Sequence, residues 1–421
     1  MSRKMVFGRY DFAMFGTFIA YAVGSLVVPV ALVQVARDLG FTLDEGGTSR
    51  GGWLHMMRCV SICMTLALSG FMAGRWGNRK PLGVSVALIG AGLLLCAASP
   101  TYGVLLLALM IAGLGEGVVE ALGTPFTQEL HPEEPGRYVN FSHGFWSVGV
   151  LVSTVLFGWL LYAGMNWRVV LVLAAAFAIV PTLLLLAPEG KKKYPERPER
   201  VSVDRVLSQA KAICMVPRFW LYFAAMFLAG GGEFCLTFWC ASFIQSAHYF
   251  QSSVMQGGVG TAIFASGMLA GRTGFGFLLR QHHLKKLMLA MGVLGMLVCL
   301  AVPNLAKGAW EIKLEVFYVI LFVAGIATAP FWPSLQTHAV TRLPGLDMTM
   351  VYVMLSFAGV PGCGFFTLLM GYLGSEKEAF LAAGEQVPFY AVGMANAFYI
   401  VPACFVVIMA LLLLDRKKGV K

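Results

Sequence analysis

The chain has 421 residues, of which 58% are hydrophobic and only 12% charged, and its formal net charge is +10. A soluble domain carries about 25% charged residues, so the composition excludes an ordinary soluble protein. Apolar runs of about 20 residues recur along the whole chain and indicate membrane-spanning helices. Most basic residues lie in the short connections between these runs, so membrane topology accounts for the charge and no nucleic-acid partner is expected.

The apolar runs predict an all-α polytopic membrane protein with twelve transmembrane helices. In chain order the spans are expected at 11–35, 52–73, 82–99, 102–128, 138–162, 166–187, 219–246, 254–279, 284–303, 314–338, 349–374 and 388–414.

The basic residues gather on one side of the twelve predicted spans. They stand at the N-terminus, in "GRWGNRKP" (74–81), in the loop 191–211, in "RQHHLKK" (280–286) and in "DRKKGVK" (415–421). The positive-inside rule makes this side cytoplasmic, with both termini inside. The basic start of the chain runs into a span of full membrane length, so no cleavable signal peptide is expected. We expect a multi-pass protein of the plasma (cell inner) membrane.

One long polar stretch divides the chain into two halves. We expect an N-terminal six-helix bundle at 1–187, a cytoplasmic central loop at 188–218 and a C-terminal six-helix bundle at 219–421. "SGFMAGR" (69–75) ends the second predicted span, and "SGMLAGR" (266–272) ends the eighth. Their identical placement favours two structural repeats, as in secondary transporters.

The loop after the second predicted span carries a recognisable motif. "GFMAGRWGNRKPLG" resembles the signature of the major facilitator superfamily, which shapes the inward gate. Gly74 stands where the superfamily usually has aspartate, so the gate's usual ion pair is missing or replaced. The matching positions, which the resemblance implies are gating residues, are Gly70, Arg75, Gly77, Arg79 and Lys80.

The stretch "EALGTPFTQELHPEEPGRYVNFSHGFWSVG" (120–149) resembles the fucose–proton symporter family within that superfamily. Thr124 replaces an asparagine that often precedes the proline, and the first helix offers Gly24 and Ser25 where family members carry an acid. The resemblance implies a proton-coupled symporter of a small polar solute, a monosaccharide or sugar derivative. The matching residues are Glu120, Pro125, Pro132, Gly136, Asn140, His143 and Gly149.

Two glutamates, Glu116 and Glu120, lie one helical turn apart in the fourth predicted span. If that span begins near Tyr102, they lie roughly 20–27 Å along it. A carboxylate facing lipid costs several kcal/mol, so both must face the protein interior or a watery cavity. Burial and mutual repulsion favour a proton on one of them. We interpret the pair as a proton-coupling site; the alternative is a neutral, hydrogen-bonded core glutamate.

His143 and two neighbours on the fifth predicted span are further candidates. His143 relays a proton to the glutamates if the family packing holds, since imidazole titrates near neutral pH. A helix-cap or core histidine is the alternative. Asn140 binds substrate or opens the helix, and Trp146 is expected to line the cavity.

The seventh predicted span also contains a glutamate within an apolar stretch, "AGGGEFCLTFWCASFIQ" (229–245). Glu233 is expected at the bilayer centre, beside a triple glycine that permits close helix approach or local unwinding. Trp239 and Gln245 suit a sugar, which stacks one apolar face and presents hydroxyls to polar groups. A packed tryptophan and an interfacial glutamine are the alternatives.

Three other predicted spans contain unusual residues. Arg58 is an intramembrane arginine that snorkels outward, forms an ion pair or binds an anion. Arg272 ends the repeated "SGMLAGR" and is expected in the gate. Pro330 and Pro333 in "ATAPFWPSLQTH" (327–338) break the tenth span and allow a gating bend, and Gln336 is a candidate cavity residue.

The sequence shows no nucleotide-binding loop, zinc signature or catalytic triad, so we expect neither an enzyme nor a cofactor. We interpret the nine cysteines as small apolar packing residues. We expect a monomer that transports by alternating access. The competing hypotheses are a proton-linked exporter of amphiphilic or cationic compounds, a symporter of sugar acids or organic anions that uses Arg58 or His143, and a membrane sensor that retains the fold.

Overall fold

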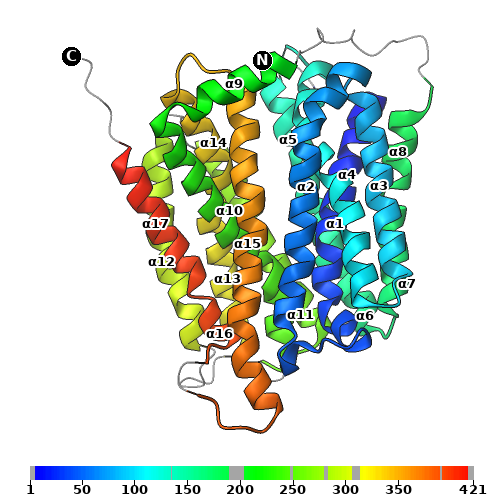
Figure 1. The fold of residues 1–421 in the computed structure, drawn as a ribbon, viewed down its shortest axis with the longest axis vertical. Coiled ribbons are helices and arrows are strands. Elements are labelled where there is room, and N and C mark those ends of the chain that lie inside the picture. Colours follow the sequence, from blue (N-terminus) through cyan, green and yellow to red (C-terminus); the bar gives the residue numbers. More distant parts are fainter. Residues whose placement is uncertain are drawn as a thin grey trace. The chain divides into compact units, whose positions relative to one another are not determined.

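The computed structural model describes residues 5–133, 135–188, 203–246, 250–278, 283–305, 313–388 and 391–415 (Figure 1). These residues are helical apart from short connections, which confirms the all-α fold. The helices are α1 (Arg9–Asp38), η1 (Leu43–Glu45), α2 (Thr48–Trp76), α3 (Arg79–Ala97), α4 (Tyr102–Leu130), α5 (Pro135–Leu151), η2 (Val152–Leu156), α6 (Phe157–Tyr162), α7 (Trp167–Ala176), α8 (Ile179–Leu186), α9 (Val203–Cys214), α10 (Pro217–Gln245), α11 (Val254–Leu278), α12 (Leu284–Leu305), α13 (Leu314–Thr328), α14 (Phe331–Arg342), α15 (Met348–Ala382), α16 (Met394–Ala397) and α17 (Ile400–Leu414).

Twelve segments among the described residues are long and apolar enough to cross a membrane. They coincide with the twelve predicted spans, and most ends differ by only a few residues. Four spans consist of more than one helix: α5–η2–α6, α7–α8, α13–α14 and α16–α17. The twelve-span prediction is confirmed.

The largest differences from the predicted boundaries fall around the last connection. The eleventh span was expected to end at 374, but α15 continues to Ala382, and the twelfth span begins at Met394 rather than 388. Polar residues lowered the hydropathy beyond 374, yet the segment is rich in Glu, Lys and Ala, which are good helix formers. The helix therefore continues past the apolar stretch (orange in Figure 1) and ends before Gly384, whose φ is +69°.

Two of the four interrupted spans bear on the sequence predictions. The tenth is interrupted between α13 and α14, and Pro330 directly precedes the first residue of α14. This is the break that the sequence predicted. The fifth contains a π-helical turn, η2, which the sequence pattern did not reveal.

The chain forms two compact units. The first comprises Met1–Ala31 and Val60–Val203, and the second comprises Leu32–Cys59 and Asp204–Lys421. Helices α1 and α2 therefore each contribute residues to both units. The expected central loop at 188–218 lies partly outside the described residues; its described part contains α9.

Within the second unit, α10 and α15 are joined by very close backbone contacts. A Cβ atom on Gly230 would overlap the carbonyl oxygen of Gly359, and one on Gly231 would overlap the ring of Phe366. Helix α10 stays α-helical through the glycines. The triple glycine therefore serves close helix approach, one of its two predicted roles, and not unwinding.

Both units use cations in the same way at the end of their last span. In the first unit, Arg9 Nε donates to Leu184 O (2.9 Å) and Arg79 Nη1 to Leu185 O (2.9 Å), at the end of α8. In the second unit, Arg218 and Lys285 bind Asp415, directly after α17. The cations stand at the beginning of α1 and α3 in the first unit and at the beginning of α10 and α12 in the second. Cations at a helix C-terminus satisfy free carbonyls and the helix dipole.

All nine cysteines are free thiols, and seven of them are buried. The burial of these seven agrees with a packing role, whereas Cys63 and Cys214 are only partly buried.

Candidate functional site

Glu116 lies in the middle of α4 and is completely buried. It stands between two glycines that admit the backbones of neighbouring helices. A Cβ on Gly115 would overlap Ser85 O in α3, and a Cβ on Gly117 would overlap Ile62 O in α2. The sequence "GEG" therefore lets two helices close around a carboxylate and remove it from lipid.

Glu116 also approaches α1, at Gly24. A Cβ added to Gly24 would lie 3.2 Å from Glu116 Oε1 and 2.8 Å from the side chain of Ile89. A methyl group at Gly24 would overlap the Ile89 side chain and crowd the carboxylate. The glycine in α1 and the glutamate in α4 are thus matched in size.

Glu120 lies one turn further along α4 and is half-buried. The Tyr21 hydroxyl of α1 donates a hydrogen bond to Glu120 Oε2 at 3.3 Å. The sequence reading missed Tyr21, although an amphipathic tyrosine within an apolar span is a usable signal because its hydroxyl needs a partner.

His143 of α5 meets α4 one further turn away. Its Nε2 lies 2.8 Å from Thr124 Oγ1, and its ring lies 4.4 Å from the ring of Phe18. The imidazole is exposed, and its described contact to α4 is with Thr124. Trp146 is half-buried. The side chain of Asn140 lies outside the described ones.

We refer to Glu116, Glu120 and Thr124, spaced four residues apart on one face of α4, as the α4 polar row. Residues four apart on a helix lie about 5–6 Å apart at their Cβ atoms. The row runs from the buried Glu116, past Tyr21, to the exposed ring of His143. It places two carboxyl groups, a hydroxyl and an imidazole at short intervals between the interior of the first unit and its surface.

The second unit contains a buried ion pair. Glu233 of α10 is buried, and Arg272 Nη2 of α11 lies 3.3 and 3.4 Å from its two carboxylate oxygens. Glu233 was predicted to bind substrate and Arg272 to belong to the gate. The structure joins the two residues in one pair.

Arg272 also reaches the break in the tenth span. Pro333 has no N–H, so the carbonyl of Ala329, four residues earlier, lacks its helical donor. Arg272 Nε donates to Ala329 O at 3.4 Å. Glu233 and Thr328 line a small pocket next to the same break. The proline break is therefore coupled to the ion pair through Arg272.

The two partners of this pair should differ in their importance for stability. Removing one partner of a buried ion pair costs about 3–5 kcal/mol, and the 32% exposure of Arg272 lowers that cost. A glutamate left without its partner can bind a proton, whereas an arginine cannot release one. We expect Glu233→Gln to lower the thermal unfolding temperature more than Arg272→Gln, measured in detergent. Equal losses, with no recovery in the double variant, would contradict this asymmetry.

Three side chains that were predicted to bind substrate make hydrogen bonds to other groups of the second unit. Trp239 is fully buried, and its Nε1 donates to Thr367 O at 3.0 Å. The Gln245 amide donates to Ala241 O of its own helix at 3.0 Å, and that of Gln336 donates to Ser356 Oγ at 3.4 Å.

Arg58 of α2 is buried, with 4% of its surface exposed. One turn before it, His55 is also buried, and its ring stacks on Phe234 of α10 at 5.0 Å. The imidazole Nε2 lies 3.5 Å from Cys59 Sγ. The sequence reading overlooked His55, although a histidine three residues before an intramembrane arginine is a detectable signal.

The predicted gate residues of the first unit lie at the end of α2 and the start of α3. Gly77 has a φ of +71°, a conformation that only glycine adopts freely. Arg75 is exposed, with its guanidinium 5.8 Å from the centre of the Trp76 ring. Around Gly70 there is open space. Arg79 binds the end of α8, as described above.

Carboxylates buried in spans of two helical units are typical of polytopic secondary transporters. The comparison with protein families agrees with this class. The chain belongs to the major facilitator superfamily, whose family model matches residues 13–305. The twelve spans make it a multi-pass membrane protein of a transporter family, and this family is not one of enzymes.

Solved structures of the same fold cover nearly the whole chain. The chain is similar to the Escherichia coli fucose:proton symporter (TM-score 0.63, 17% identity, 97% of this chain and 98% of that one). It is also similar to the nucleoside transporter NupG (TM-score 0.72, 14% identity, 97% and 99%) and to a D-xylose-proton symporter (TM-score 0.70, 15% identity, 97% and 97%). At these identities the likeness shows the fold.

Curated relatives match about half of the chain. They include the probable metabolite transport protein CsbC of Bacillus subtilis (28% identity, 45% of this chain, 39% of the relative). The galactose-proton symporter of Escherichia coli K12 is 26% identical over 48% of this chain and 44% of its own length. The polyol transporter 5 of Arabidopsis thaliana is 26% identical, over 48% and 35%. The chain spans less than half the length of these relatives.

Proposed function

We propose that the protein is a proton-coupled symporter of a small polar solute, a monosaccharide or sugar derivative, which works by alternating access between two six-span halves, 1–187 and 219–421. It acts as a monomer in the plasma (cell inner) membrane. The names of three relatives, the galactose-proton, fucose:proton and D-xylose-proton symporters, support the coupling and the substrate class.

The observation that carries the proposal is the α4 polar row. Glu120 is the proton carrier: Tyr21 stabilises its ionised form, and Glu120 can itself donate when it is protonated. Glu116 lies beside Gly24 of the first helix, the helix in which the resemblance implies an acid. Its charge next to Glu120 disfavours the doubly ionised state. His143 provides the exposed end at which protons enter or leave.

A neutral substrate fits this charge distribution best. Buried carboxylates repel an anion unless they are protonated or a cation offsets them. In the second unit, Arg272 is held by Glu233. Hydroxyl-rich neutral solutes need donors and acceptors without net charge, which carboxylic acids, amides and phenols supply.

One observation favours a second candidate function, symport of a sugar acid or another organic anion. Arg58 is an intramembrane cation that is 96% buried, and His55 stands one turn away. An intramembrane ionisable residue is a functional candidate by default.

Flux measurements in liposomes test the proposed function. An inward proton gradient should drive accumulation of a radiolabelled monosaccharide. Uptake driven only by a gradient in the opposite direction would instead identify an exporter. No flux with sugars, sugar acids or amphiphilic cations would identify a sensor that retains the fold.

The two substrate classes separate in a thermal-shift screen of the purified protein. We expect neutral sugars to stabilise it, with their apparent affinity within a few-fold of wild type in Arg58→Gln. Arg50→Gln on the exposed start of the same helix is the matched control. Stabilisation by sugar acids alone, lost in Arg58→Gln and kept in Arg50→Gln, would overturn the neutral-sugar reading in favour of the anion.

A further inference from the structure

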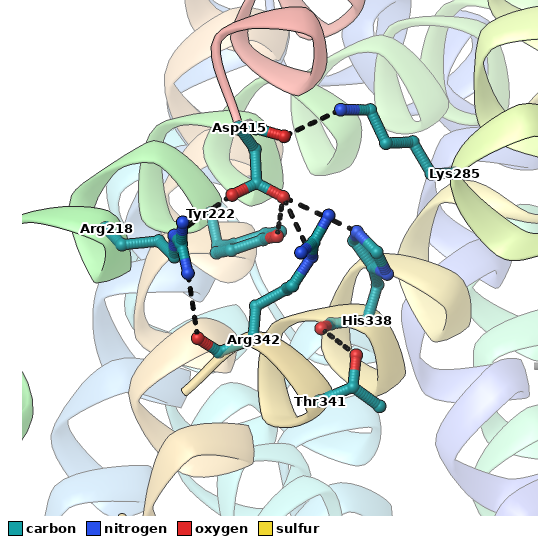
Figure 2. Close-up of polar contacts among 7 residues, drawn as sticks. All are labelled: Arg218, Tyr222, Lys285, His338, Thr341, Arg342 and Asp415. Atoms are coloured by element: carbon teal, nitrogen blue, oxygen red, sulfur yellow. Dashed lines mark hydrogen bonds and ion pairs between the residues drawn. The ribbon is translucent and has the colours of Figure 1, made fainter. Parts of the chain in front are cut away.

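A cluster of basic side chains surrounds a single carboxylate in the second unit (Figure 2). Asp415 follows α17 and is almost completely buried. Arg218 Nε lies 3.0 Å from its Oδ1, and Arg342 Nε lies 3.2 Å from its Oδ2. The Tyr222 hydroxyl donates to Oδ2 at 2.8 Å. The remaining members of the cluster are His338, 3.7 Å from Oδ2, and Lys285, which donates to the Asp415 carbonyl at 2.7 Å.

The charges in this cluster do not cancel. Arg218, Lys285 and Arg342 are three cations against one carboxylate. The C-termini of α14 and α17 each add about half a negative charge, and the N-termini of α10 and α12 each add about half a positive one. The cluster therefore keeps about two positive charges. Binding Asp415 and capping two helix ends does not account for three cations.

The excess charge is accessible from outside the protein. Arg218 is 30% exposed at its side chain and Arg342 is 15% exposed, whereas Asp415 is 1% exposed. Figure 2 shows the two guanidinium groups on either side of the aspartate. An incoming anion would meet the cations before it met the carboxylate.

The neighbouring residues place the cluster at the depth of lipid headgroups. Trp220, two residues after Arg218, is 48% exposed, and its Nε1 donates to Cys214 O. Leu207 and Met215, in and just after the amphipathic α9, are also exposed. Tryptophan favours the membrane interface, and an amphipathic helix with exposed apolar residues lies in the plane of that interface. Four span ends meet here, on the side that the positive-inside rule assigns to the cytoplasm.

We propose that the Arg218–Lys285–Arg342 cluster is a binding site for the phosphate group of an anionic membrane lipid. Arginine binds phosphate oxygens with two N–H groups at once, and lysine adds a point charge. Basic pockets between spans on the cytoplasmic side bind such headgroups. The lipid's acyl chains would lie along the apolar surface beside Trp220. The site is independent of the α4 polar row.

Lipid binding to the purified, delipidated protein tests this proposal. Native mass spectrometry counts retained lipids, and thermal unfolding reports stabilisation, during titration with phosphatidylglycerol, phosphatidylcholine or inorganic phosphate. We expect phosphatidylglycerol to bind and stabilise. Lys285→Gln and Arg342→Gln should each weaken binding about fivefold, as expected for one cation at a membrane surface.

Lys286→Gln is the matched control, because Lys286 is the exposed next residue and the charge change is identical. It should leave binding unchanged. Lys285→Arg keeps the charge and should retain binding, which separates lost charge from lost folding. Equal weakening by Lys286→Gln, or equal binding of phosphatidylcholine, would overturn the site. Stabilisation by inorganic phosphate without phosphatidylglycerol would overturn the lipid as the source of the phosphate.

Discussion

Replacement of Glu120 by glutamine should abolish proton-driven accumulation of substrate while leaving exchange of substrate across the membrane partly intact. The amide keeps the size of the side chain and can still accept the hydrogen bond from Tyr21. It cannot bind and release a proton, so the proton gradient can no longer drive transport through this residue. Exchange needs no net proton movement. The measurement compares gradient-driven uptake with counterflow in the same liposome preparation.

Two variants control this experiment. Glu116→Gln should be milder, because the proposed role of Glu116 is to disfavour double ionisation. Glu315→Gln, at an exposed glutamate in the first turn of α13, should behave as wild type. Full accumulation in Glu120→Gln would remove Glu120 from the coupling role. A more severe loss in Glu116→Gln would reverse the roles of the two glutamates.

Replacement of Gly230 by alanine should strongly destabilise the protein. The new Cβ would overlap the backbone oxygen of Gly359, which cannot move without shifting α15 against α10. Overpacking of a close contact typically costs about 1–3 kcal/mol, occasionally more. We expect a lower thermal unfolding temperature in detergent and a lower yield of monodisperse protein.

Gly232 provides a matched control on the same helix. A Cβ there would lie 3.6 Å from the Cys404 side chain, an ordinary contact distance. Glycine in a helix is less favourable than alanine by roughly 1 kcal/mol, so Gly232→Ala should be neutral or slightly stabilising. Equal destabilisation by both variants would show that helix flexibility, and not the close contact with α15, explains the glycines.

The spans were predictable from the sequence because hydropathy depends only on composition within a window of membrane length. The predicted span boundaries were less accurate where a segment is polar but still forms a helix. The segment after residue 374 is too polar to count as a span, yet it continues α15 because its residues favour helix. The π-helical turn η2 leaves no mark on hydropathy at all.

The candidate site was predictable as a set of residues but not as a set of contacts. Buried carboxylates stand out in apolar runs, so Glu116, Glu120 and Glu233 were found. Their partners depend on which helices pack together, and that information is spread over distant residues. Arg272 lies 39 positions after Glu233. Asp415 was interpreted only as part of a basic tail, although it binds side chains from three helices, α10, α12 and α14.

The capped ends of the last spans bear on how the chain is made. In the first unit, Arg9 and Arg79 are synthesised long before the carbonyls at the end of α8 that they bind. In the second, Arg218 and Lys285 likewise precede Asp415. During membrane insertion these cations therefore lack their acceptors until the last helix of each unit has been inserted. A chain that stops before α8 or α17 would therefore lack the acceptors that these cations bind in the complete fold.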